Sequence, residues 1–147
     1  MIVRAARPDD CPALAELDAL CNPSPWSARQ FAACLAHAHE TVLLAEHGRE
    51  LAGLMVWQKI VDEAELHLID TAPAMRRRGV ASLLLQQLFA QAAAQGVRRI
   101  TLEVRRSNLA AQALYRRHGF RECGRRPNYY PLPDGSREEA ILMEKPC

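Results

Sequence analysis

The chain has 147 residues, of which 49% are hydrophobic and 24% are charged, and its formal net charge is +2. This length and composition predict one globular domain over residues 1–147, able to bury a core without a disulfide or metal staple. The nearly balanced charge argues against a general nucleic-acid binder, whose surface is strongly basic. Almost all basic residues are arginine, which grips phosphate well, although codon usage explains the bias equally well.

The cysteines, the histidines and the N-terminal segment indicate a reducing compartment and no metal. The five cysteines are odd in number and form no CxxC pair, so neither a disulfide framework nor a zinc site is expected. The histidines are scattered without a convincing metal-ligand spacing. Asp9 and Asp10 stand where a signal peptide has its apolar run, and no apolar stretch approaches the roughly 18 residues of a membrane span. We therefore expect a cytoplasmic protein that does not contact a membrane.

Apolar spacing and helix breakers predict the elements of the first half of the chain. Pro8 followed by two acids suits the first turn of a helix, and Ser27 suits the cap of the next one. Two prolines in segment 22–26 place a loop between these helices. The expected elements are a strand at 2–5, a helix carrying Leu14, Leu17 and Cys21, a helix carrying Phe31 and Leu35, and strands at 41–46, 51–60 and 65–71.

The second half of the chain alternates between the two kinds of element. Val80, Leu84 and Leu88 follow each other at four-residue spacing, which predicts a helix from Gly79 to Gly96. The remaining expected elements are a strand at 98–104, a helix at 108–118, and strands at 120–124 and 139–143 with a long loop between them. The order β-α-α-β-β-β-α-β-α-β-β predicts a single-domain α/β fold with a mixed sheet.

The segment from Ile69 to Ala81 predicts an anion-binding turn. A strand ends there, three arginines follow, and Gly79 opens a long helix. The N-terminus of a helix offers unpaired N–H groups and partial positive charge, so it binds phosphate readily. The alternative is an ordinary strand-to-helix connection with a solvated basic run. The segment has neither the Gly-Lys-Ser/Thr of a nucleoside-triphosphatase loop nor the Gly-x-Gly-x-x-Gly of a dinucleotide-binding fold.

Two motifs resemble those of the GNAT superfamily of acetyltransferases. Arg76-x-x-Gly79-x-Ala81 is similar to its acetyl-CoA cradle, and the segment from Leu102 to Phe120 is similar to its second signature. Pro25-Trp26-Ser27 and Asn128-Tyr129-Tyr130-Pro131 resemble the ribosomal-protein-alanine acetyltransferases within it. The resemblance covers nearly the whole chain and implies a mixed, mostly antiparallel sheet flanked by helices. Asp70 departs from the pattern, which has a small or apolar residue there.

The resemblance implies acetyl transfer from acetyl-CoA, as co-substrate, to the N-terminal α-amine of a protein. The implied substrate is the N-terminal alanine of a small-subunit ribosomal protein, with no direct nucleic-acid partner. Asn108 is implied to contact CoA, although it also suits a helix cap. The residues expected to bind CoA are Ile69, Asp70, Thr71, Arg76, Arg77, Arg78, Gly79, Val80, Ala81 and Asn108.

Two side chains are candidates for the proton transfers. Glu103 interrupts the alternation of Leu102 and Val104, and a carboxylate within reach of an amine can act as general base. The alternative is a carboxylate on a solvated sheet face. Tyr115 is the candidate general acid for the departing thiolate, and the alternative is a half-buried core aromatic. The resemblance favours the catalytic interpretation of both residues.

The acceptor is the least determined part of this interpretation. Pro25, Trp26, Tyr129 and Tyr130 are candidates for the walls of a peptide slot, or else they pin their loops. The acids of segment 62–65 are expected to attract a basic N-terminus. An acetyltransferase of a small amine and a non-catalytic CoA-binding module remain as alternatives.

Overall fold

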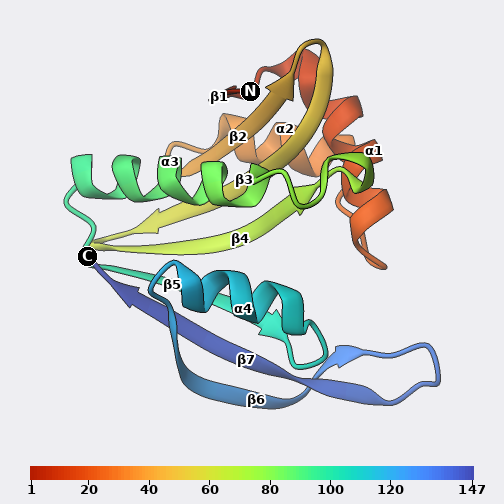
Figure 1. Ribbon diagram of the computed structural model, residues 1–147, viewed down its shortest axis with the longest axis vertical. Coiled ribbons are helices and arrows are strands. Elements are labelled where there is room, and N and C mark those ends of the chain that lie inside the picture. The colour runs from red at the N-terminus through yellow and green to blue at the C-terminus, as the bar shows by residue number, and fades with distance from the viewer.

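Seven strands and four α-helices make up the fold in the computed structural model, which describes residues 1–147 (Figure 1). Their order along the chain confirms the order predicted from the sequence. Short 3-10 turns at Pro8–Asp10 and Pro73–Met75 precede the first and third helices. The bounds are β1 Ile2–Ala5, α1 Cys11–Cys21, α2 Ala28–Ala36, β2 Glu40–His47, β3 Glu50–Ile60, β4 Glu63–Thr71, α3 Val80–Ala94, β5 Arg99–Arg105, α4 Leu109–Arg117, β6 Arg121–Pro131 and β7 Arg137–Pro146.

All strands belong to one sheet with the order β1-β2-β3-β4-β5-β7-β6. Only β4 and β5 pair in parallel, which confirms the mixed, mostly antiparallel sheet. Their pairing runs from Glu63 opposite Arg99 to Leu66 opposite Leu102 and goes no further. Beyond those residues the two strands diverge, and Figure 1 shows them as the arms of a V.

Two apolar clusters fill the two faces of the sheet. The larger one joins α3 and α4 to β2–β5 and β7, and its buried side chains include Leu84, Leu88, Leu102 and Tyr115. The smaller one packs α1 and α2 against the opposite face of β2 and β3. The helices therefore cover both faces of the first half of the sheet, and α4 covers one face of the second half (Figure 1). None of these helices combines the length and apolarity that crossing a membrane requires.

The helix ends follow the local sequence. The Ser27 side chain accepts a hydrogen bond from the Gln30 N–H, and the Gln30 side chain accepts one from the Ser27 N–H, so the expected cap of α2 is present. Asn108 caps α4 by accepting from the Ala111 N–H at 3.1 Å. The cap role expected for Asn108 is thus confirmed, and its carboxamide is held at the start of α4.

The long loop expected between residues 124 and 139 is wrong. β6 continues to Pro131 and β7 begins at Arg137, so Tyr129 and Tyr130 lie in a strand and only 132–136 form the turn. β6 is the edge of the sheet, where a proline is tolerated because one side of the strand needs no donor. A bulge between Arg126 and Tyr130, with Asn128 at φ +52°, absorbs the irregular backbone.

We predict that Gly53→Ala destabilises the protein, because β3, β4 and α3 approach closely there. A Cβ on Gly53 would lie 2.6 Å from Val80 Cγ1 and 2.7 Å from the Asp70 carbonyl oxygen. Overpacking of this kind costs about 1–3 kcal/mol of the free energy of unfolding. Urea denaturation measures it, with Gly124→Ala as control, since a Cβ there would meet only the mobile Leu142 side chain at 3.2 Å. Equal urea midpoints for the two variants would contradict the close approach of β3, β4 and α3 at Gly53.

Candidate active site

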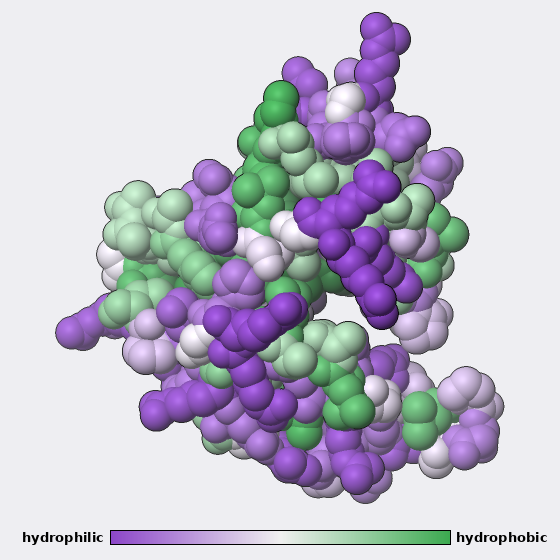
Figure 2. Space-filling model, viewed as in Figure 1, coloured by the Kyte–Doolittle hydropathy of each residue, from purple (hydrophilic) through white to green (hydrophobic).

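The divergence of β4 and β5 opens a cavity of about 890 Å³ that crosses the sheet. A volume of this size lies within the range of small-molecule and cofactor sites. Figure 2 shows the molecule hollowed between its two halves, with hydrophilic and hydrophobic residues both bordering the hollow. The cavity is lined by the end of α1 and the loop after it, by β4, by the N-terminus of α3, by β5 and α4, and by the end of β6.

The N-terminus of α3 forms one end of this cavity and is open to a ligand. Gly79 is its N-cap, at φ +78°, and no side chain caps the helix. A Cβ at Gly79 would meet nothing within 4 Å, so the space in front of the helix is free. The unpaired N–H groups of the first turn and the helix dipole favour an anion there, and Arg76 and Arg77 line the same space. These features fit the pyrophosphate of CoA.

The predicted CoA-binding residues are mostly brought together. Arg78 is the exception, because it does not line the cavity and its guanidinium lies 3.8 Å from the Met75 sulfur. The cavity is lined by Ile69, Asp70, Thr71, Arg76, Arg77, Gly79, Val80, Ala81 and Asn108.

β4 presents an unpaired backbone edge to the cavity. Ile69, Asp70 and Thr71 pair with β3 on one side, but they lie beyond the last residue that pairs with β5. The register between β3 and β4 shifts between Val56 and Trp57, just beyond the last β4 residue that pairs with β5. Free N–H and C=O groups along such an edge can pair with an extended ligand chain.

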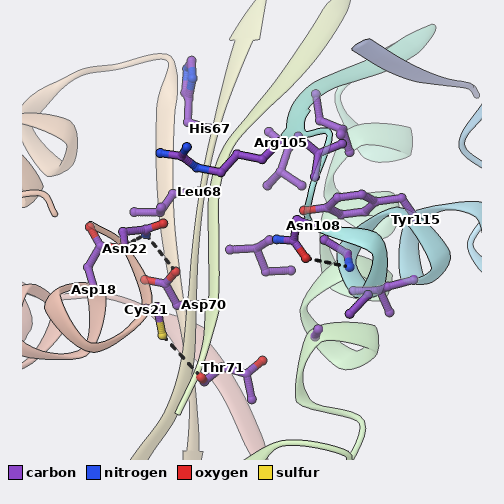
Figure 3. A pocket seen from close by; sticks show the side chains of 18 of the residues that line it. Asp18, Cys21, Asn22, His67, Leu68, Asp70, Thr71, Arg105, Asn108 and Tyr115 are labelled. Atoms are coloured by element: carbon purple, nitrogen blue, oxygen red, sulfur yellow. Dashed lines mark hydrogen bonds between the residues drawn. The ribbon is translucent and has the colours of Figure 1, made fainter. Parts of the chain in front are cut away.

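The Asp70 side chain does not face this edge. Figure 3 shows it on the α1 side of β4, pointing toward Asp18 and Asn22, while Tyr115 and Asn108 lie on the other side of the strand. Any contact that Asp70 makes with a ligand between β4 and β5 is therefore through its backbone.

Glu103 is the first residue of β5 beyond the last pair with β4. Its side chain lines the cavity on the face opposite to the buried Leu102 and Val104, and it is 21% exposed. The Arg126 guanidinium lies 3.3 Å from its carboxylate. Glu103 therefore lines the cavity, as a general base must, and it also belongs to the charged, solvated face of the sheet. Each of the two interpretations of this residue describes part of its surroundings.

Tyr115 lies on α4, on the other side of β5 from Glu103. It is buried among the core residues, with its ring edge-on to Phe120 at 5.7 Å. Figure 3 shows the phenol pointing from α4 toward β4, and the residue lines the cavity. Burial raises the pKa of Tyr115 far above that of a free tyrosine, with the charges of Tyr130 and Asp70 contributing less. The hydroxyl therefore keeps its proton at neutral pH.

The aromatic residues divide between the cavity and its surroundings. Trp26 is half-buried, packs against Phe31 at 5.4 Å between ring centroids and also lines the cavity, whereas Pro25 does not. Tyr130 lines the cavity, and the Arg105 guanidinium lies 4.5 Å from its ring centroid. Tyr129 is 40% exposed and stands outside, edge-on to Tyr130. Of the four predicted slot residues, Trp26 and Tyr130 thus line the cavity.

The structure adds cavity residues that the sequence analysis missed. Asp18 lies one helical turn after Leu14, so a carboxylate in the apolar stripe of α1 was the available signal. Arg105 lies on the same face of β5 as Glu103, and the sequence already showed the two-residue spacing that places them there. No group of three or more His, Cys, Asp or Glu side chains is arranged to hold a metal ion.

The acids of segment 62–65 supply less free charge than expected. Glu63 pairs with Arg99 at 2.9 Å, and Asp62 lies 3.9 Å from Arg98. Glu65 has no arginine partner, but it lies 3.9 Å from His67. The attraction of a basic peptide by this segment is therefore weaker than the sequence suggests.

Comparison with known proteins identifies the family. Residues 11–120 match the acetyltransferase (GNAT) family. The chain is 38% identical, over 93% of its length and 91% of the relative's, to the ribosomal protein bS18-alanine N-acetyltransferase of Escherichia coli. The crystal structure of an Escherichia coli ribosomal-protein-alanine N-acetyltransferase superposes with a TM-score of 0.91 and 34% identity, covering 99% of this chain and 92% of that one.

A second solved structure shares the fold at lower identity. The ribosomal-protein-alanine N-acetyltransferase of Brucella melitensis covers the whole of both chains with a TM-score of 0.88 and 22% identity. The family match spans both motifs that the sequence suggested and the strands and helices that form the cavity between them. The chain therefore belongs to the acetyltransferase (GNAT) family.

Proposed function

We propose that this protein transfers the acetyl group of acetyl-CoA to the N-terminal α-amine of a protein, and that its substrate is a small-subunit ribosomal protein beginning with alanine. One observation carries the proposal: a single cavity is lined by the N-terminus of α3, by Glu103 and Tyr115, and by the aromatic residues Trp26 and Tyr130. The relatives named for this reaction, two of them at 38% and 46% identity, support the substrate. Its place of action is then the cytoplasm, where ribosomes are assembled.

The donor half of the cavity holds acetyl-CoA in this proposal. The first N–H groups of α3, Arg76 and Arg77 bind the pyrophosphate, because they present positive charge around the open space at Gly79. The pantetheine arm pairs with the free edge of Ile69, Asp70 and Thr71. That geometry brings the thioester into the gap beside Glu103.

The transfer itself moves protons at the nitrogen and at the sulfur. The α-ammonium of the substrate, with a pKa near ~8, loses its first proton to Glu103 directly or through water. The amine nitrogen then attacks the thioester carbon, the C–S bond breaks, and the departing sulfur receives the proton of the Tyr115 hydroxyl. The nitrogen releases its second proton to water to give the amide, and solvent returns a proton to Tyr115. A backbone N–H on the β4 edge stabilises the oxyanion that forms between these steps.

The phosphate site predicts a large effect for Gly79→Asp. The new carboxylate would project into the open space before α3 and repel the pyrophosphate, so we expect CoA affinity to fall at least about 100-fold, or about 2.7 kcal/mol. Gly96→Asp is a matched control, because Gly96 lies just after the other end of α3 at φ +71° and a Cβ there also meets nothing within 4 Å. Calorimetry with CoA measures both variants. Equal affinities in the two folded variants would refute the phosphate site.

The acid and base predict separate kinetic losses. Glu103→Gln and Tyr115→Phe remove one proton-transfer group each while keeping shape, and each should lower kcat about 100-fold or more. Glu122→Gln is the control for the first, because Glu122 is a surface carboxylate that also pairs with an arginine, Arg125 at 2.5 Å. Affinity for CoA should stay near wild type in both variants. Rates above half of wild type would show that water alone carries the protons.

The substrate is tested with peptides and small amines side by side. We expect acetylation on the α-amine of a peptide that begins with alanine followed by basic residues. The same peptide beginning with leucine should react at least about tenfold more slowly, since a side chain three carbons larger must fit beside Trp26 and Tyr130. Mass spectrometry locates the acetyl group. Acetylation mainly on lysine, or a preference for spermidine over every peptide, would favour a small-amine acetyltransferase instead.

A further inference from the structure

Two carboxyl groups are buried next to each other on the α1 side of β4. Asp18 is fully buried and Asp70 is 4% exposed, and both line the acceptor half of the cavity. Asp18 accepts hydrogen bonds from the Trp26 backbone N–H at 2.7 Å and from the Asn22 carboxamide. The same Asn22 nitrogen reaches Asp70 Oδ1 at 3.3 Å (Figure 3).

One oxygen of this group lacks a donor. Asp70 Oδ2 is the single buried side-chain oxygen or nitrogen without a hydrogen-bond partner. A buried charge without a partner costs several kcal/mol, and it is normally avoided by binding a proton. The Asp18 carboxyl group lies within hydrogen-bonding reach of Asp70, so a proton on Asp70 would have an acceptor ready.

Given the groups around Asp70, binding a proton is the simplest way for it to avoid an unpaired buried charge. From α1 it faces Asp18 and Cys21, from the following loop Asn22, and the Tyr115 phenol lies across the strand. The nearby cation is Arg76, which acts on the Cys21 thiol rather than on Asp70. Burial first, and then the hydrogen bond and charge of Asp18, raise the pKa of Asp70 to about 8.

We propose that Asp70 carries a proton and donates it to Asp18, and that this acid latch (Asp18, Asn22 and Asp70) holds the loop 22–27 against β4 so that Trp26 forms the wall of the acceptor slot. Asp70 is then a positioning residue that acts through Asp18 and Trp26. This inference rests on the proposed function for the slot, but the latch itself is a property of the free protein.

The latch explains why a buried acid follows the apolar residues Leu68 and Ile69 in β4. The Trp26 N–H depends on Asp18, and Asp18 remains free to accept it only while Asp70 supplies a proton between the two carboxyl groups. When Asp70 ionises, two buried negative charges face each other and the loop separates from β4. The slot should therefore be formed below about pH 8 and should loosen above it.

The kinetic test compares two substitutions. Asp70→Asn keeps a donor toward Asp18, so the KM for the alanine peptide should stay within about twofold of wild type at pH 7 and should not rise above pH 8. Asp70→Ala removes the donor and should raise that KM about fivefold or more, with the KM for acetyl-CoA unchanged. At each pH, the peptide KM of wild type is divided by that of Asp70→Asn. This ratio removes the effect of titrating the substrate amine, which is the same for both proteins. A change in the acetyl-CoA KM alone, or equal peptide KM values in all three proteins, would overturn the latch.

A second test needs no substrate, so it separates failure of the latch from failure of the proposed function. Trp57 is 1% exposed, whereas Trp26 is half-buried, so acrylamide quenching reports on Trp26. Quenching should increase above about pH 8 in wild type, be high at every pH in Asp70→Ala, and stay low in Asp70→Asn. Quenching that does not depend on pH or on residue 70 would refute the latch, whatever the substrate is.

The free energy of unfolding should depend on pH in the same direction as the slot does. Because the pKa of Asp70 is raised from 3.8 to about 8 on folding, its stabilising effect is complete below about pH 4 and is lost as the pH rises to about 8. Relative to Asp70→Asn, the free energy of unfolding of wild type should therefore fall across that interval. A constant difference between the two proteins would show that Asp70 does not bind a proton on folding.

Discussion

The parallel pairing of β4 and β5 stops at Leu66 and Leu102, and the site is built around the gap that follows. In a continuous sheet, the backbone N–H and C=O groups would pair between neighbouring strands, and no ligand could pass between those strands. Here the edge of β4 from Ile69 to Thr71 is unpaired toward β5, while β5 continues with β7 alone. The gap therefore provides both a hole in the sheet and a row of backbone groups along its side.

Packing around β4 and β5 fixes the point at which these strands diverge and the position of α3 beside the gap. Leu66 and Leu102, the last pair, are buried in the larger core cluster together with Tyr115 from α4, so the base of the V is fixed. α3 sits close to β3 and β4 because Gly53 has no side chain in the way. That position brings the N-terminus of α3 to the mouth of the gap, where an anion gains most from the free N–H groups.

Much of this arrangement was readable from the sequence, because it depends on local patterns. The helix periodicity of Val80, Leu84 and Leu88 and the glycines beside α3 and α4 predict the elements and their order correctly. The Arg76–Gly79 turn and the alternation around Glu103 predict residues that do line one cavity. Local patterns also define the Ser27 and Asn108 caps.

What the sequence could not predict depends on the neighbours of each strand. Pro127 and Pro131 indicate a loop, and they are compatible with β6 only because it is the sheet edge and carries a bulge. Asp62 and Glu63 look free until Arg98 and Arg99 of the neighbouring strand are placed beside them. The meeting of Asp18 and Asp70 joins residues 52 positions apart, and no periodicity in either segment indicates it.

The alternation of side chains along β5 separates the two proton-transfer groups of the proposed reaction. Leu102 and Val104 point to the face that α4 covers, so Glu103 necessarily points to the other face, and Tyr115 on α4 lies across the strand from it. An amine approaching from the Trp26 side meets Glu103, and a thiol leaving toward α4 meets Tyr115. A carbonyl between them must lie within the sheet, which only the gap permits.

The same geometry accounts for the charged groups around Glu103, the proposed base. Glu103 belongs to an open face of the sheet on which most carboxylates pair with arginines, and its own partner is Arg126 at 3.3 Å. Arg126 also lies 5.4 Å from the centre of the Tyr129 ring, on the strand that carries the cavity wall Tyr130. In the proposed reaction, the cationic amine of the substrate takes the place of this arginine beside Glu103, and until then the ion pair holds the carboxylate in position.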